Sequence, residues 1–228
     1  MAMTDAGIAR SKLTLAFLSG CSFPLAFAPL ALHPLAWLSL AILWLLWEGE
    51  TPRTAARLGF SWGAGAFLSG TYWLYISIHI FGEAPIAVAI LLMLSLVSIM
   101  ALYLALVGWL ALRVSVDGNA YWLLVLPGGW VLVEWFRGWF LSGFPWLSLG
   151  YSQTDGWLAG YAPVLGVYGA SLATAILAGC VVSLIRGRGL LRLRAGTKRA
   201  PLASRRGAPR RVADHGPRLA DARVDLEE

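Results

Sequence analysis

Six long apolar runs constrain the fold of this chain more than any other feature of its sequence. They cover residues 13–30, 35–47, 58–80, 85–112, 120–141 and 158–185. A membrane-spanning helix needs about 20 mostly apolar residues, whereas the strands of a membrane barrel alternate apolar and polar residues. Because only helices or closed barrels satisfy their backbone groups in lipid, we expect an all-α fold. The expected architecture is a polytopic membrane helical bundle of about six transmembrane helices.

The composition agrees with a membrane protein and separates a tail from the helical part. Hydrophobic residues make up 58% and charged residues 13% of the chain, against about 45–50% and about 25% in ordinary soluble domains. Residues 1–185 hold 6 Lys or Arg and 7 Asp or Glu, whereas residues 186–228 hold 12 and 5. We expect a transmembrane helical domain over residues 1–185 and no nucleic-acid partner, because the basic excess is confined to the tail.

The basic tail over residues 186–228 has no sustained apolar period and is dense in Arg, Ala, Gly and Pro. Two interpretations stay open. A chain of this composition cannot bury enough apolar surface to fold, so we expect a disordered C-terminal tail. The same composition also fits a frameshift product, since GC-rich codons read out of frame encode these residues.

Basic residues near the ends of the runs predict the orientation. They are Arg10, Lys12, Arg53, Arg57, Arg113, Arg186 and Arg188. With six spans, all of them fall on one side of the membrane, which the positive-inside rule identifies as the cytoplasm. Both termini are therefore expected to be cytoplasmic, and only Arg137 departs from the pattern. The first run is interpreted as a retained helix, because further apolar runs follow it instead of a polar mature domain.

Small residues inside the runs predict where helices approach closely. The spacings are Gly59-x3-Gly63 and Gly65-x3-Ser69 in the third run, and Gly166-x3-Ala170 in the sixth. In the fifth run, the sequence Pro127-Gly128-Gly129 predicts a kink or local unwinding, because proline cannot complete the helical hydrogen-bond ladder.

Common enzyme signatures are absent from the sequence. It contains no GxSxG, HExxH or Walker motif, and no GxGxxG followed by an acidic residue. The three histidines, His33, His79 and His215, are scattered, and Cys21 and Cys180 lie in apolar runs. We expect no metal site, no cofactor and no disulfide framework.

Residues 134–153, EWFRGWFLSGFPWLSLGYSQ, combine charges and aromatic rings in an otherwise apolar chain. Glu134 and Arg137 are three residues apart, so they share a helix face. They form either an ion pair that locks the helix end, with Arg137 reaching the interface, or a polar pocket in which Arg137 meets a lipid phosphate. The aromatic rings form either an interfacial belt or a slot open to lipid. The candidate lipid-lining residues are Glu134, Arg137, Trp139, Gly143, Phe144, Pro145, Trp146, Tyr151 and Gln153.

Several short motifs carry a resemblance to a known family. They read EWFRGW over 134–139, SGFPW over 142–146, LGYSQ over 149–153, APVLGVYG over 162–169, SGTYWLYISI over 69–78 and LAFAP over 25–29. Together they resemble the membrane domain of apolipoprotein N-acyltransferases, over about residues 13–185. Each motif alone is a weak signal, whereas the combination is specific.

The resemblance implies a bacterial inner-membrane protein of lipoprotein maturation. Such enzymes transfer an acyl chain from a membrane phospholipid to the N-terminal amine of a diacylated lipoprotein. Their catalytic unit is a nitrilase-like domain with a Glu base, a Lys and a nucleophilic Cys, and no residue here matches that set. We therefore expect a truncated, catalytically incomplete membrane domain that is inactive alone, and the resemblance implies that its enzyme class is acyltransferase. The alternative is a membrane-embedded lipid-binding or scaffold module that works with a separately encoded catalytic partner.

Overall fold

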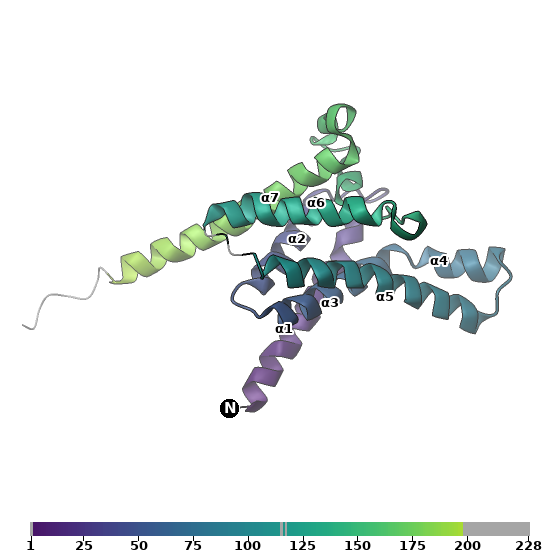
Figure 1. Ribbon diagram of the computed structural model, residues 1–228, viewed down its shortest axis with the longest axis horizontal. Coiled ribbons are helices and arrows are strands. Elements are labelled where there is room, and N and C mark those ends of the chain that lie inside the picture. Colours follow the sequence, from purple (N-terminus) through teal and green to yellow (C-terminus); the bar gives the residue numbers. More distant parts are fainter. Residues whose placement is uncertain (1, 115, 117, 198–228) are drawn as a thin grey trace, which may run out of the picture. The chain divides into compact units, whose positions relative to one another are not determined.

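The computed structural model describes residues 2–114, 116 and 118–197 of the chain, and every regular element in these residues is helical, with no strand (Figure 1). The helices are α1 (Ala2–Ser22), η1 (Phe23–Ala26), α2 (Pro34–Trp47), α3 (Pro52–Gly70), α4 (Trp73–Ile76), η2 (Ser77–Phe81), α5 (Ile86–Ala111), η3 (Tyr121–Val125), α6 (Leu126–Arg137), η4 (Phe140–Ser142), η5 (Leu149–Gln153), η6 (Ala159–Tyr161) and α7 (Ala162–Thr197). The all-α prediction is confirmed. The chain divides into two compact units, residues 1–189 and 190–228, and the bundle lies in the first.

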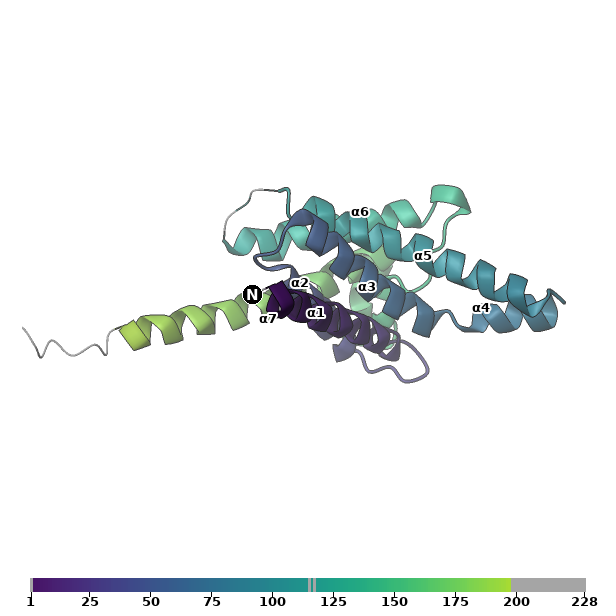
Figure 2. The same cartoon turned by 90° about the horizontal axis from the view of Figure 1, so that it is seen from below.

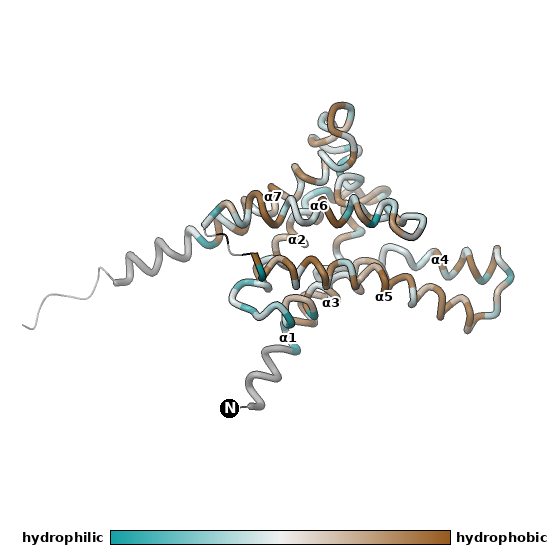
Figure 3. The backbone as a smooth tube through the Cα atoms, in the orientation of Figure 1, coloured by the Kyte–Doolittle hydropathy of each residue, from teal (hydrophilic) through white to brown (hydrophobic). Residues whose placement is uncertain are grey.

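Two of the described helices are long and apolar enough to cross a membrane, over Ile86–Ala111 and Ala159–Gly187. The shorter helix Pro34–Trp47 is also apolar. Figure 3 shows the apolar character running along α5, whose exposed side chains are Ile86, Val88, Ile90, Leu91, Leu92, Leu94, Ile99, Leu102, Leu106 and Leu110. These apolar helices indicate a membrane protein, and the count of six spans stays a prediction.

The first and third runs do not form the uninterrupted helices that we expected. α1 ends at Ser22 and a 3₁₀ turn with Pro24 in its first residues follows, so the helix does not reach residue 30. α3 begins at Pro52, after Thr51 has capped it by accepting a hydrogen bond from the Thr54 amide (3.2 Å), and ends at Gly70. A turn then leads into α4 and a π-helical segment, so residues 58–80 make two helices joined by a turn.

The helices α1, α3 and α5 pack through glycines, with α3 between the other two (Figure 2). A Cβ built on Gly65 would lie 2.2 Å from the Phe17 carbonyl oxygen, and one built on Gly59 would lie 2.4 Å from the Leu104 carbonyl oxygen. No side chain fits in either place, so the predicted close contacts of the third run are confirmed. This packing encloses an apolar core that includes Trp44, Trp47 and Trp62, each 1% exposed or less.

Gly166 has a different role from the one that its spacing predicted. Its backbone has φ 65° and ψ −171°, which breaks the α-helical geometry inside α7. A Cβ built on it would meet nothing within 4 Å, so it makes no close helix contact. The prediction was wrong because spacing alone does not distinguish a packing glycine from one that supplies a positive φ. Its partner in the motif, Ala170, is buried as expected.

The fifth and sixth runs also differ from straight helices. Residues Tyr121–Val125 are wound as a π-helix directly before Pro127, in agreement with the local unwinding that the proline predicts. α7 continues through Arg186 to Thr197, so residues 186–197 of the expected tail are helical, and the domain boundary at residue 186 stays a prediction. The rest of that expected tail, residues 198–228, lies outside the described residues.

Two ion pairs join the turn between α2 and α3 to other helices. Lys12 of α1 pairs with Glu50. Arg186 of α7 pairs with Glu48 at 2.6 Å and also lies over the Trp122 ring, 5.0 Å from its centroid. This turn therefore contacts the first and the last helix of the bundle.

Candidate functional site

Glu134 lies on the last turns of α6 and is 4% exposed. Its Oε1 accepts two hydrogen bonds, from Trp130 Nε1 at 2.9 Å and from the Leu149 amide at 2.7 Å. Its Oε2 has no hydrogen-bond partner among the described residues. The carboxylate therefore connects α6 to the start of η5, fifteen residues further along the chain.

Arg137, one turn later, is also 4% exposed. Its Nη1 donates to the carbonyl oxygens of Phe144 (2.9 Å) and Trp146 (2.5 Å). Its Nη2 donates to Ser148 Oγ at 3.0 Å. The planar fork of a guanidinium suits such diverging acceptors. Arg137 therefore holds the loop of residues 144–149, hereafter the 144–149 loop, against the end of α6.

The interpretation of Glu134 and Arg137 as a locking ion pair is wrong. The ion pairs formed by the described residues are those of Glu48 and Glu50, and neither includes Glu134 or Arg137. Each of the two buried charges is bound to the 144–149 loop instead. The Arg137 side chain is buried and directed onto loop carbonyl oxygens. The shared helix face was correctly predicted, whereas the partners were not.

The backbone of the 144–149 loop and of the two residues before it adopts conformations that most residues avoid. Ser142, Gly143 and Leu147 have φ values of 74°, 76° and 58°. Positive φ suits Gly143, which also comes so close to the Gly138 carbonyl oxygen that a Cβ would lie 2.1 Å from it. Leu147 carries a bulky side chain, so holding its backbone at this φ costs of order 1–2 kcal/mol. The bonds from Arg137 and Glu134 to residues 146, 148 and 149 stabilise it there.

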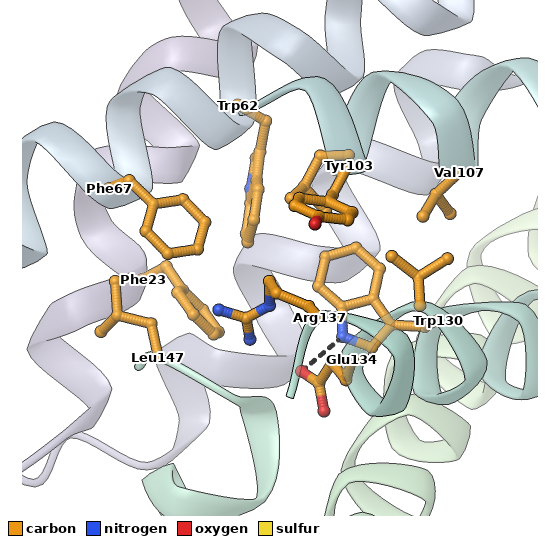
Figure 4. A pocket seen from close by; sticks show the side chains of 11 residues that line it. Phe23, Trp62, Phe67, Tyr103, Val107, Trp130, Glu134, Arg137 and Leu147 are labelled. Carbon is orange, nitrogen blue, oxygen red and sulfur yellow. Dashed lines mark hydrogen bonds between the residues drawn. The ribbon is translucent and has the colours of Figure 1, made fainter. Parts of the chain in front are cut away.

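A small cavity of about 20 Å³ lies beside the two buried charges. We call it the inner cavity, and its lining residues are Phe23, Trp62, Phe67, Tyr103, Leu104, Val107, Trp130, Val133, Glu134, Arg137 and Leu147. Figure 4 shows the Arg137 guanidinium among Phe23, Phe67 and Leu147, with Trp130 bonded to Glu134. A space of this size holds about one water molecule. It is too small for any part of a lipid headgroup.

A much larger pocket, of about 650 Å³, opens where three connecting segments meet. We call it the outer pocket, and it is lined by Pro24, Phe27, Ala28, Pro29, Gly70, Tyr72, Trp73, Pro145, Trp146, Leu147, Tyr151 and Thr154. The Trp73 and Trp146 rings meet in it, with centroids 5.2 Å apart. None of these lining residues, all within the described part of the chain, carries a charge. The pocket is therefore suited to an apolar ligand and has no charged side chain that would pair with a phosphate.

The nine predicted lipid-lining residues fall into different places. Pro145, Trp146 and Tyr151 line the outer pocket, whereas Glu134 and Arg137 line the inner cavity. Gln153 is 2% exposed and lines a separate space of about 240 Å³ together with Tyr151. The other three are Trp139, which is 53% exposed, Gly143, whose role is the turn, and Phe144, whose carbonyl oxygen binds Arg137.

The other two walls of the outer pocket were not among the predicted site residues. These walls come from residues 24–29 and 70–73. Both segments lie in or beside the LAFAP and SGTYWLYISI motifs that carried the resemblance, so the signal was present in the sequence. His33 supports the same region, since its Nδ1 lies 2.7 Å from the Ser152 carbonyl oxygen. Among the described residues, no group of three or more His, Cys, Asp or Glu side chains could hold a metal ion.

Comparison with known proteins identifies the family. A family model described as the apolipoprotein N-acyltransferase N-terminal domain matches residues 19–180. The apolipoprotein N-acyltransferase of Methylococcus capsulatus is 41% identical over 173 residues, which are 75% of this chain and 34% of that protein. Those of Nitrosomonas europaea and Azotobacter vinelandii are 40% and 46% identical, over 78% and 75% of this chain and 36% and 34% of theirs. The chain thus spans about a third of the length of the curated relatives it matches. It belongs to the apolipoprotein N-acyltransferase N-terminal domain family.

Proposed function

We propose that this chain is the membrane domain of an apolipoprotein N-acyltransferase-type enzyme, and that the outer pocket holds an acyl chain of the phospholipid donor. The observation that carries the proposal is the pocket itself. Its volume of about 650 Å³ lies within the roughly 300–1,000 Å³ of ordinary ligand sites. Its walls include residues of four of the family motifs, and their uncharged, aromatic lining suits hydrocarbon.

The energetics favour a chain over a headgroup. Each methylene that leaves water for an apolar site contributes about 0.8 kcal/mol. A phosphate would need charged or hydrogen-bonding partners, and the nearest candidate, Arg137, donates instead to the 144–149 loop. The hydroxyl groups of Tyr72, Tyr151 and Thr154 are the polar groups available to orient the ester end of the lipid.

The proposed setting is the bacterial inner membrane. Residues 1–185 form the transmembrane domain with about six spans and both ends in the cytoplasm, supported by the distribution of Lys and Arg. In this arrangement the outer pocket opens on the side opposite the cytoplasm, because the segments that line it follow α1, α3 and α6, the helices of the first, third and fifth runs. The acceptor is an apolipoprotein, as the names of the relatives suggest, and the family resemblance implies that it is a diacylated lipoprotein.

Photocrosslinking tests the assignment of the outer pocket. The purified protein in nanodiscs is irradiated with a phosphatidylethanolamine that carries a diazirine at the end of one acyl chain, and labelled peptides are mapped by mass spectrometry. We expect saturable labelling in residues 24–29, 70–73 and 145–154, reduced by unlabelled phosphatidylethanolamine. Labelling of the exposed face of α5 should instead rise linearly with lipid, as for any surface in contact with the bilayer.

Variants of the lining make the test specific. Trp73→Ala and Trp146→Ala remove the two rings that meet in the pocket, and each should lower the saturable labelling several-fold. Trp157→Ala is the matched control, since Trp157 is 81% exposed and lines none of the described pockets. The proposal fails if wild-type labelling at the three segments does not saturate, or if Trp157→Ala lowers it as much as the pocket variants do.

A further inference from the structure

Leu147 lies between the two spaces at the site. Of the described residues that line them, it is the one shared by the outer pocket and the inner cavity. Removing its side chain would therefore join a space of about 650 Å³ to one of about 20 Å³ that contains two buried charged groups. Its side chain is half-buried and packs against the apolar core.

On two neighbouring elements, nearby residues also line different spaces. On η1, Phe23 lines the inner cavity and Pro24 the outer pocket. On α3, Phe67 lines the inner cavity and Gly70 the outer pocket. Leu147 completes this wall from the third side, as its position beside Phe23 in Figure 4 shows.

The wall is closely packed. A Cβ built on Gly70 would lie 2.6 Å from Leu147 Cδ1 and 2.9 Å from Pro24 Cγ. A real side chain has no room there, so the Leu147 methyl group rests against the glycine backbone. The separation of the two spaces therefore depends on the Leu147 side chain. A side chain at position 70 could not replace it, because there is no room for one.

The backbone of Leu147 is held in place against its own preference. A bulky residue with φ of 58° is uncommon, and such a residue persists only when its surroundings determine it. Arg137 binds the residues on both sides, through the Trp146 carbonyl oxygen and Ser148 Oγ. Glu134 binds the next amide, at Leu149. The two buried charges thus fix the direction in which Leu147 points.

The inner cavity is too small to extend the outer pocket for a chain end. Its space of about 20 Å³ holds about one water molecule. The Leu147 side chain therefore gives the outer pocket an apolar floor.

We propose that Leu147 sets the depth of the outer pocket and thereby the length of acyl chain that it accepts. The inference rests on the proposed function, because it assumes that the outer pocket binds an acyl chain. Within the pocket, each added methylene strengthens binding about fourfold. This gain ends at the length at which the chain terminus meets Leu147.

The test compares chain-length profiles. Phosphatidylethanolamines with saturated acyl chains of increasing length compete against the diazirine lipid in nanodiscs, for wild type and for Leu147→Gly. Glycine suits the positive φ at this position, so the variant loses the side chain without backbone strain. We expect affinity to level off with length in wild type, and to level off in Leu147→Gly at a chain longer by about two or more methylene groups, with a tenfold or greater gain for those longer chains.

Two controls separate the floor from general effects. Leu147→Met keeps a side chain of similar volume and should retain the wild-type profile. Leu91→Ala removes carbon atoms from a residue of α5 that is 65% exposed and lines none of the described pockets, and should also leave the profile unchanged. Circular dichroism and gel filtration establish that each variant is folded.

The outcomes distinguish the two proposals. Saturable competition with the same levelling-off length in wild type and Leu147→Gly overturns the role of Leu147 and leaves the proposed function intact. Absence of saturable competition in folded wild-type protein overturns both. A shift of equal size in Leu91→Ala also overturns the role of Leu147, because the length limit would then not depend on this wall.

Discussion

Replacing Arg137 by lysine tests whether the shape of this side chain, and not its charge alone, holds the 144–149 loop. The guanidinium donates to three acceptors, the carbonyl oxygens of Phe144 and Trp146 and the hydroxyl of Ser148. A lysine keeps the charge, but its single nitrogen cannot reach acceptors that two separate nitrogens now serve. At least one acceptor in a buried setting would lose its partner.

The magnitude follows from these bonds. A hydrogen bond to a charged group contributes about 1.5–3 kcal/mol, and an orphaned buried acceptor adds to the cost. We expect Arg137→Lys to lower the free energy of unfolding by about 2–4 kcal/mol. For a chain of this size, a loss of this order lowers the midpoint of thermal unfolding by about 4–16 °C. The weakened bonds would also hold Leu147 less firmly at its positive φ, which should loosen the loop further.

Two assays in detergent check this expectation. The first is thermal unfolding followed by the loss of the monodisperse gel-filtration peak. The second is limited chymotrypsin digestion, which should cut faster after Trp146 once the loop is loose. Arg113→Lys is the control, since Arg113 is exposed and lies over the Trp109 ring, 3.6 Å from its centroid; it should change stability by less than about 1 kcal/mol. A stability of Arg137→Lys equal to that of wild type, with unchanged cleavage, would refute the reasoning.

Four further substitutions and one assay test other parts of the structure. Glu134→Ala removes the acceptor of two buried hydrogen bonds and should cost about 2–4 kcal/mol by thermal unfolding; a loss below about 1 kcal/mol would contradict the assigned contacts. Gly20→Ala places a Cβ 2.0 Å from the Trp62 carbonyl oxygen and should cost about 1–3 kcal/mol, whereas Gly128→Ala meets nothing within 4 Å and should be neutral or stabilising. Gly166→Ala forces alanine into a positive φ and should cost about 1–2 kcal/mol; an unchanged midpoint would mean that the backbone adjusts freely there. With labelled phosphatidylethanolamine and a lipopeptide acceptor, we expect no N-acylation by this chain alone, because none of its residues matches the Glu, Lys and Cys of the family, and transfer would refute that expectation.

The helical character of the chain and the place of its most unusual residues could be predicted from the sequence. Long apolar runs admit few alternatives, and a spacing of three puts Glu134 and Arg137 on one helix face whatever the tertiary structure. The small-residue spacing of the third run also carried real information, because a backbone can approach closely only where a side chain is missing.

The partners of the two buried charges could not be predicted in the same way. The natural expectation for opposite charges three residues apart is that they bind each other, and here both bind the loop that follows. Most of the groups they bind belong to the backbone, which has a carbonyl or amide at every position and therefore leaves no mark in the sequence. The end of α3 at Gly70 was missed for a related reason, since the residues after it are as apolar and aromatic as a continuing helix would be.

The two ion pairs at the turn between α2 and α3 have a consequence for the order in which the bundle is completed. The Lys12–Glu50 pair joins residues 38 positions apart, whereas the Arg186–Glu48 pair joins residues 138 positions apart. At a synthesis rate of about 5–20 residues per second, Arg186 emerges roughly 7–28 s after Glu48. During that interval Lys12 of α1 can already pair with Glu50, whereas Arg186 of α7 is not yet available to Glu48. Glu48 therefore forms its ion pair only when α7 joins the bundle. The same short turn binds the first helix early and the last helix late.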